Sequence, residues 1–334
     1  MNDQPNQSRG IITVFGGSGF VGRHVVRALA KDGWRIRVAT RRPDLAFHLQ
    51  PLGKVGQIHA VQANVRYPAS VAAALRGAQA VINLSGIQIE KGQQTFEATH
   101  VFGARAIAKA AHGAGITNFV QISGIGASSE SDSAYVRSRG RGDAAVREII
   151  PGAIILQPSV VFGPEDHFFN RFAAIAKIAP VLPIFGGEAR LQPVYAGDVA
   201  KAAAAALRGE AKSGLTYELG GPEVVTMKEI LKFICFTTGR KRLLTPVPAL
   251  VGNAMAFGTE LASTLTFGLF PKTLLVTRGQ VKMLGTDNIV SEAATAQGRT
   301  LEGLGIAPES IESIVPSYLI RFRKTGQFET AKPA

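Results

Sequence analysis

A glycine-rich segment near the start of the chain has the residue types and spacing of a phosphate-binding loop. It reads Val14-Phe15-Gly16-Gly17-Ser18-Gly19-Phe20-Val21-Gly22, and three of its glycines stand three residues apart. The first glycine permits a tight turn, the second lets backbone N–H groups approach a pyrophosphate, and the third lets the next helix pack closely against the strand. The segment follows an apolar run and precedes a helical pattern, which predicts a dinucleotide site. The residues expected to contact the dinucleotide are Gly16, Ser18, Gly19, Phe20, Val21 and Gly22.

Two cations follow about twenty residues further on, where an NAD site normally has a carboxylate that binds the ribose 2′-hydroxyl. The sequence there is Thr40-Arg41-Arg42-Pro43-Asp44. A guanidinium pairs with a 2′-phosphate through two parallel hydrogen bonds, whereas an acid would repel that phosphate. Arg41 and Arg42 therefore predict NADPH as the cofactor and disfavour NADH. The alternative is that both arginines only point into solvent.

The elements that must hold this loop alternate between strand and helix. Short apolar runs predict strands at 11–15, 35–39, 58–63, 80–84, 118–123 and 153–157. Helical spacing of apolar residues predicts helices between them at 23–31, 70–76, 93–112 and 134–150. Together they predict an α/β fold, a Rossmann-type doubly wound parallel sheet covered by helices on both faces.

After Pro158 the alternation loosens, and further helices are predicted at 198–207, 227–238 and 248–266. We therefore expect an NADP(H)-binding domain over 1–158 and a smaller, mixed α/β C-terminal lobe over 159–324, from which strands can return to the main sheet. A polar, flexible tail is expected over 325–334.

The chain has 334 residues with 37 Lys and Arg against 24 Asp and Glu, a net charge of +13. This surplus favours polyanionic partners such as phosphates, an anionic membrane face or an acidic protein surface. No nucleic-acid-binding motif accompanies the basic residues, so we predict no nucleic-acid partner. No spacing of His, Asp and Glu indicates a metal site.

Cys235 is the single cysteine, which excludes an internal disulfide, and its apolar neighbours predict a structural thiol. The first ten residues are polar, so no signal peptide is expected. The segment 243–275 is largely apolar but broken by prolines. It is predicted as a buried or partner-facing helix, with an interfacial helix as the alternative, and no transmembrane segment is expected.

Motifs along the first two-thirds of the chain resemble those of the extended and atypical short-chain dehydrogenase/reductase superfamily. Besides the glycine loop, the similar segments are 64–65, 83–86, 120–123, 135–139 and 158–163. Within the superfamily, 157–166 followed by 168–172 is most similar to one branch. That branch is the NAD(P)H-binding accessory subunit of respiratory complex I and its bacterial relatives.

The resemblance implies further cofactor contacts that run from the adenine to the nicotinamide. They are Asn64 and Val65 beside the adenine, Ser85 and Gly86 near the centre, Tyr135 and Arg139 facing the nicotinamide ribose, and Ser123, Pro158 and Ser159 at the nicotinamide end.

Hydride transfer in this superfamily uses a serine, a tyrosine and a lysine four residues after the tyrosine. A tyrosine of pKa about 10 is a poor base at pH 7, and the lysine on the same helix face lowers that pKa. Here Ser123 and Tyr135 are present, but Arg139 replaces the lysine. Arginine keeps the charge yet cannot release a proton at neutral pH. We interpret the three residues as a remnant set and assign no catalytic residue. His100, His112 and His167 are interpreted as structural.

The first function hypothesis is an NADPH-binding, stabilising accessory subunit of bacterial respiratory complex I, NADH:ubiquinone oxidoreductase, without turnover of its own. Its partners would be complex I subunits in the peripheral arm near the membrane, with anionic lipid as a further contact. Its location would be peripheral, on the cytoplasmic side of the inner membrane, with Arg321, Arg323 and Lys324 on a docking surface. The alternatives are a free-standing NADPH-dependent reductase or epimerase and a redox-sensing regulator. The sequence names no substrate.

Overall fold

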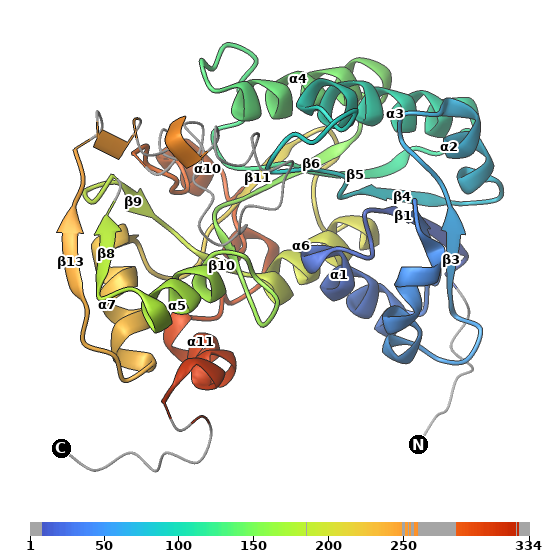
Figure 1. Ribbon diagram of the computed structural model, residues 1–334. Coiled ribbons are helices and arrows are strands. Elements are labelled where there is room, and N and C mark those ends of the chain that lie inside the picture. The colour runs from blue at the N-terminus through green and yellow to red at the C-terminus, as the bar shows by residue number, and fades with distance from the viewer. Residues whose placement is uncertain are drawn as a thin grey trace. The chain divides into compact units, whose positions relative to one another are not determined.

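Seven apolar segments of the chain pair into one parallel sheet (Figure 1). The computed structural model describes residues 9–184, 186–248, 251–252, 254, 257–259, 285–324 and 326. The strands of the sheet are β1 (Ile11–Phe15), β2 (Arg35–Thr40), β3 (Ile58–Gln62), β4 (Ala80–Asn83), β5 (Asn118–Ile122), β6 (Ile154–Pro158) and β11 (Thr216–Leu219). Their order is β11-β6-β5-β4-β1-β2-β3. The side chains of Ile12, Val14 and Ile82 are fully buried, because both faces of the sheet are covered.

Helices lie on both faces of this sheet, which confirms the predicted Rossmann-type fold. Figure 1 shows α1 (Phe20–Lys31) and α6 (Ala196–Arg208) below the sheet and α2 (Pro68–Leu75), α3 (Gly103–Gly113) and α4 (Ala134–Ile149) above it. The strand order reverses between β1 and β4, so the loops after these two strands diverge to opposite faces. In open α/β sheets the ligand crevice lies at this switch point, outside the carboxyl ends of the strands.

The helix predicted at 93–112 begins later than expected and starts with a different winding. A π-helical turn, η2, spans Glu97–Phe102 and leads directly into α3. The preceding residues are held in a turn, because the Glu90 carboxylate accepts a hydrogen bond from the Phe96 N–H at 2.6 Å. Single π-turns often occur at functional sites. A 3₁₀ segment, η1 (Pro43–Leu52), follows β2 and was not predicted.

The chain divides into two units. The sheet unit comprises the described parts of Met1–Pro158, Ala196–Leu219 and Val290–Ala307, and the second unit comprises those of Ser159–Tyr195, Gly220–Ile289 and Pro308–Ala334. The chain thus leaves the sheet unit after β6 and returns to it twice. The first return supplies α6 and β11, and the last supplies α10 (Glu292–Ala296) and η3 (Glu302–Leu304).

The second unit combines three pairs of short strands with helices. The pairs are β7 (Val161–Phe162) with β10 (Val194–Tyr195), β8 (Val181–Ile184) with β13 (Leu243–Pro246), and β9 (Arg190–Leu191) with β12 (Val225–Thr226). Its helices include α5 (Phe169–Ile178), α7 (Met227–Thr237), α11 (Ile311–Leu319) and the 3₁₀ segment η4 (Ile320–Phe322). They enclose a core that contains Phe162, Phe169 and Leu231.

Parts of the chain for which predictions were made lie outside the described residues. These are most of the apolar segment 243–275, including most of the helix predicted at 248–266, and the predicted tail at 325–334 apart from residue 326. The described residues of that predicted helix, 251–252, 254 and 257–259, are helical. Within the described part of the chain, each helix is too short or too polar to cross a bilayer.

Candidate functional site

The glycine loop lies at the switch point and has the backbone geometry that a phosphate seat needs. Gly16 has φ of +78°, and a Cβ there would lie 2.8 Å from the carbonyl oxygen of Leu84. A Cβ on Gly22 would lie 2.3 Å from the carbonyl oxygen of Gly16. Helix α1 begins after Gly19 without a side-chain cap, so the N–H groups of its first turn remain available to an anion. The loop therefore fits the pyrophosphate of a dinucleotide.

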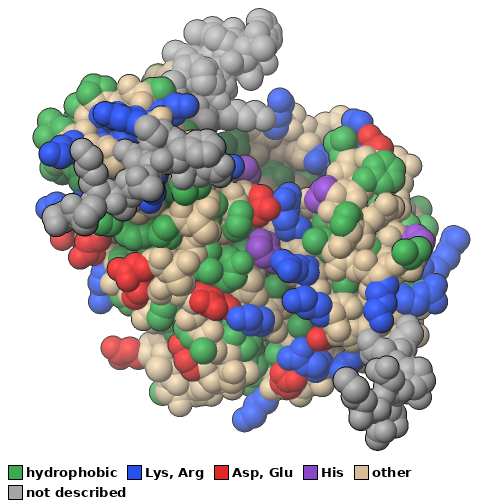
Figure 2. Space-filling view, turned by 90° about the horizontal axis from the view of Figure 1, so that it is seen from below, with side chains coloured by type: hydrophobic (Ala, Val, Ile, Leu, Met, Phe, Trp, Pro, Cys, Tyr) green, Lys and Arg blue, Asp and Glu red, His purple; other side chains and the backbone are tan. Residues whose placement is uncertain are grey.

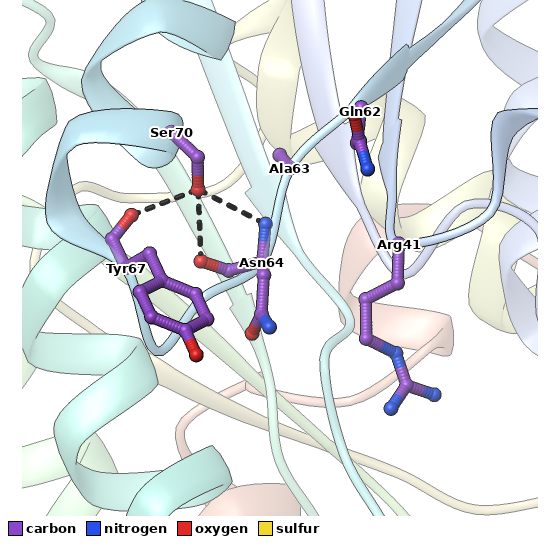
Figure 3. Close-up of a pocket in the computed structure, with 6 residues that line it drawn as sticks. All are labelled: Arg41, Gln62, Ala63, Asn64, Tyr67 and Ser70. Carbon is purple, nitrogen blue, oxygen red and sulfur yellow. Dashed lines mark hydrogen bonds between the residues drawn. The ribbon is translucent and has the colours of Figure 1, made fainter.

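A cavity of about 290 Å³ opens beside the ends of β2 and β3 (Figure 3). It is lined by Arg41, Gln62, Ala63, Asn64, Tyr67 and Ser70. The Ser70 hydroxyl accepts the Asn64 N–H at 3.0 Å and lies 2.8 Å from the Tyr67 carbonyl oxygen, which fixes the turn after β3. Figure 3 shows the side chains of Arg41, Asn64 and Tyr67 extending in the same direction from this turn and from the end of β2. The cavity thus combines a cation, an amide and an aromatic ring, which suits a purine nucleotide.

The two arginines after β2 have different surroundings. Arg42 pairs with Asp44, with Nη2 2.7 Å from Oδ2 and Nε 3.0 Å from Oδ1. The hydrogen bond from Arg42 lowers the pKa of Asp44, and Asp44 in turn raises the pKa of Arg42. Arg41 lines the cavity and has no ion pair with any part of the chain that the structure describes. Its charge is therefore available to an anionic group, whereas that of Arg42 is already compensated.

Ser85 and Gly86, which the resemblance assigned to the centre of the cofactor, follow β4, and the Ser85 backbone lies beside Gly16 of the glycine loop. The Ser85 N–H donates to Asn83 Oδ1 at 2.9 Å, and the amide of Asn83 donates to Gln121 on β5, also at 2.9 Å. Asn83 and Gln121 are buried. This pair therefore fixes the backbone after β4, and sequence reasoning had not given Gln121 any role.

Arg139 projects from α4 across the carboxyl ends of β4 and β5. Its Nη1 donates to the carbonyl oxygen of Ile122 at 3.3 Å, and its guanidinium carbon lies 5.5 Å from the centre of the Tyr135 ring. A Cβ on Gly86 would lie 2.2 Å from Arg139 Nη2, so the guanidinium packs directly on this glycine. Among the described residues, its buried Nε has no hydrogen-bond partner. The structure thus brings together three residues that the sequence assigned to the cofactor.

Tyr135 is held by aromatic neighbours from the π-turn. Its ring packs edge to face against Phe96 and His100, with centroids 5.6 Å and 5.5 Å away. His100 accepts the Ile87 N–H at Nε2, at 3.0 Å, and its Nδ1 lies 2.8 Å from the Ser138 hydroxyl. Burial and the nearby charge of Arg139 lower the pKa of His100 to about 3. His100 is therefore neutral at pH 7, and its two ring nitrogens contact Ile87 and Ser138.

Asp143 is a buried carboxyl at this end of the site that the sequence analysis missed. It lies on α4, one turn after Arg139, and Gln157 Nε2 donates to its Oδ2 at 3.3 Å. Burial raises the pKa of Asp143 to about 6, and the four neighbours that oppose this rise are Ser123, Gln157, Arg139 and Arg147. Its spacing of four after Arg139 places both on one helix face, which could have indicated this role. Asp143 provides a buried counter-charge for Arg139.

The other residues predicted to contact the cofactor lie in different parts of the structure. Val65 packs against Gly103 at the start of α3, and Ser123 is buried just beyond β5. Pro158 ends β6, and its carbonyl accepts the Ile125 N–H at 3.1 Å. Ser159 belongs to the second unit, where its hydroxyl lies 2.8 Å from both oxygens of Asn288. In the described ranges, His, Cys, Asp and Glu form no group that could bind a metal ion.

This geometry is that of a dinucleotide-binding Rossmann domain of the extended short-chain dehydrogenase/reductase class. The model of the NAD dependent epimerase/dehydratase family matches residues 12–220, and the chain belongs to that family. The chain is 33% identical to the NADH dehydrogenase [ubiquinone] 1 alpha subcomplex subunit 9, mitochondrial, of Arabidopsis thaliana. That match covers 95% of this chain and 79% of the relative. The predicted resemblance to the complex I subunit is thereby confirmed.

The comparisons also found two further similarities. It is 33% identical to a ceramide reductase of Caulobacter vibrioides, over 58% of this chain and 59% of that protein. The solved structure of gox2253 superposes with a TM-score of 0.70 at 23% identity, over 96% of this chain and 99% of that one. At this identity the superposition supports the fold alone.

Proposed function

We propose that this chain is an NADPH-binding accessory subunit of a bacterial respiratory complex I and holds its nucleotide for structure, without turnover. The observation that carries the proposal is the contrast between Arg41, which is open to a ligand, and Arg139, which replaces the lysine of the proton relay. The near full-length similarity to a complex I subunit supports the placement.

Different residues of the sheet unit would bind different parts of the nucleotide. The first turn of α1 would take the pyrophosphate, Arg41 the 2′-phosphate, and Asn64 and Tyr67 the adenine. A 2′-phosphate would meet a guanidinium that has no counter-ion among the described residues, while no Asp or Glu lines the cavity to bind the 2′-hydroxyl of NADH. NADPH is therefore the expected ligand, and Arg42 has a smaller share because Asp44 already pairs with it.

Bound NADPH supplies a hydride donor, but its use requires a proton source for the substrate oxygen. The guanidinium of Arg139 keeps its protons at neutral pH, and it is fixed by the Ile122 carbonyl oxygen and by packing on Gly86. Tyr135 is wedged against Phe96 and His100. These residues are better suited to binding a ribose than to transferring a proton.

Retention of the nucleotide would stabilise the subunit. A ligand that binds the native state alone stabilises it by about 2.7 kcal/mol at a hundredfold excess over its Kd. The partners would be the other complex I subunits of the peripheral arm near the membrane, on the cytoplasmic side of the inner membrane. The docking surface would be supplied by the basic second unit.

The placement is tested by gentle solubilisation of native membranes followed by native electrophoresis. We expect the chain to migrate with complex I and to dissociate only under harsher detergent. Recovery of the whole population as a free soluble monomer would contradict the proposal.

A second candidate function is a free-standing NADPH-dependent reductase, favoured by the retention of Ser123 and Tyr135 and by the similarity to a ceramide reductase. It predicts that bound NADPH is oxidised when a ketone substrate is added and that Tyr135→Phe abolishes this oxidation. Survival of NADPH through a broad carbonyl panel, including long-chain keto lipids, would exclude it.

A further inference from the structure

One end of the second unit carries basic residues with no acidic neighbours in sequence. No Asp or Glu occurs in 169–184, 230–248 or 313–324. The basic end, as we call it, consists of Lys177, Arg240, Lys241, Arg242, Arg321, Arg323 and Lys324. Figure 2 shows one face of the molecule, on which Lys and Arg lie among scattered Asp and Glu side chains. The basic end is the part of the second unit whose segments contain Lys and Arg but no Asp or Glu.

Hydrogen bonds bring the three segments of the basic end together. Arg242 Nε donates to the carbonyl oxygen of Ala176 in α5 at 2.7 Å, and Arg323 Nε donates to that of Thr237 in α7 at 2.9 Å. Arg240 donates through Nε and Nη2 to the carbonyl oxygen of Phe322, at 3.1 and 2.9 Å. The guanidinium groups are thus anchored on backbone carbonyls near helix ends, which favour cations. Among the described residues, none of the seven forms an ion pair with a carboxylate.

Large apolar side chains protrude among these cations. Phe236 near the end of α7 is 86% exposed, Ile178 at the end of α5 is 70% exposed, and Leu243 at the start of β13 is 66% exposed. Leu243 pairs in register with Val181, whose strand follows α5 closely, so Ile178 and Leu243 belong to the same end of the unit. Exposed apolar groups rimmed by polar ones mark an interaction site.

We propose that the basic end is a docking surface for the anionic face of a lipid bilayer, with Phe236, Ile178 and Leu243 entering the headgroup region. The inference deepens the proposed function, on which it rests for the presence of a membrane nearby. Cations around protruding apolar side chains are the combination that anionic lipid surfaces bind. The Nε donors of Arg240, Arg242 and Arg323 are already used on backbone carbonyls. This leaves fewer donors for side-on bidentate pairing with a carboxylate, whereas a diffuse layer of negative charge needs no such geometry.

The test is co-sedimentation of the purified full chain with vesicles of phosphatidylcholine alone or with about a third phosphatidylglycerol. We expect binding to the anionic vesicles only, weakened by added salt. Lys177→Glu with Lys241→Glu should lower the partition coefficient by about tenfold or more, as should Phe236→Ser with Ile178→Ser. The matched control, Arg27→Glu with Lys109→Glu on exposed positions of α1 and α3, carries the same charge change and should bind like the parent.

Absence of binding to anionic vesicles, or equal loss in the control, would overturn the proposal. If the chain fails to bind vesicles yet still migrates with complex I, and the Lys177→Glu and Lys241→Glu pair detaches it, the basic end docks on an acidic protein. That result overturns the lipid proposal and leaves the proposed function standing. Thermal unfolding of each variant establishes that the substituted chains are folded.

Discussion

The two ends of the nucleotide crevice in the sheet unit differ in how much of their polar chemistry is already in use. At the adenine end, Arg41 faces a cavity and has no counter-ion in the described chain. At the predicted nicotinamide end, Arg139 is hydrogen-bonded to Ile122 and packed on Gly86, and Tyr135 packs against two aromatic rings. An open cation can take a new ligand at low cost, whereas Arg139 and Tyr135 are already held by contacts within the fold. The difference is the basis of our proposal that the chain binds NADPH without transferring a proton.

The largest loss of stability and of nucleotide affinity should come from Gly22→Ala. This substitution places a methyl group 2.3 Å from the Gly16 carbonyl oxygen. The helix must shift away from the loop, so we expect about 3 kcal/mol of lost stability and at least about a hundredfold lower nucleotide affinity. Thermal unfolding and calorimetry measure both. In Gly19→Ala the nearest atom is 3.3 Å away, so the apo protein should keep its stability. Equal destabilisation by the two variants would contradict the assigned roles.

Arg41→Ala should be next in size, because it removes the open cation of the adenine end. We expect NADPH affinity to fall by about 2 kcal/mol, the value of a hydrogen bond to a charged group, while NADH affinity stays nearly constant. Arg42→Ala should cost much less, since Asp44 already pairs with that side chain. Titration of each variant with both nucleotides provides the comparison, and equal affinity of the parent chain for NADPH and NADH would refute the cofactor assignment.

Acid should lower the stability of the fold through His100 at the predicted nicotinamide end. The pKa of His100 is about 3 in the folded chain and about 6.5 in the unfolded chain. The unfolded chain binds more protons between these values, so stability is lost as the pH falls through this range. From pH 7 to pH 5 the loss from this group should be about 2 kcal/mol. In His100→Asn this part of the pH dependence should disappear from denaturant unfolding. Asp143, with its raised pKa, acts in the opposite sense in both proteins and cancels in the difference.

The smallest expected effect concerns the contact between Gly86 and Arg139. A methyl group at Gly86 would lie 2.2 Å from Nη2, at the flexible end of the side chain, so Arg139 can move away. Gly86→Ala should therefore cost about 1 kcal/mol, and the shorter side chain of Arg139→Lys should relieve it. A double-mutant cycle on thermal stability measures this coupling. Additive effects would show that the two residues do not constrain each other.

Much of the sheet unit could be predicted from the sequence because its signals are local. The glycine loop, the apolar strands and the helical periodicity each depend on neighbouring residues, and the strand bounds at β1, β2 and β5 agree with the prediction within one residue. The π-turn at Glu97–Phe102 was missed because its winding depends on packing, with Gly142 of α4 lying against His100.

The sequence predicted which residue types form the candidate site, but not which neighbours surround them in the fold. The sequence treated Arg41 and Arg42 as equivalent, and only the fold separates the open one from the one paired with Asp44. Asp143 and Gln121 were missed because their roles arise from burial beside distant strands. The second unit shows no local motif, so its basic end became recognisable only when three separate segments were seen to meet.

The central claim is that the chain retains NADPH as part of a larger assembly. Native mass analysis of the protein purified gently from its own membranes tests this most directly, because it shows the nucleotide and the partners together. We predict one NADPH per chain, in complexes that contain complex I subunits, with no oxidation of the bound NADPH when carbonyl compounds are added. A free chain that is empty, or that carries NADPH and oxidises it on addition of a substrate, would contradict the account.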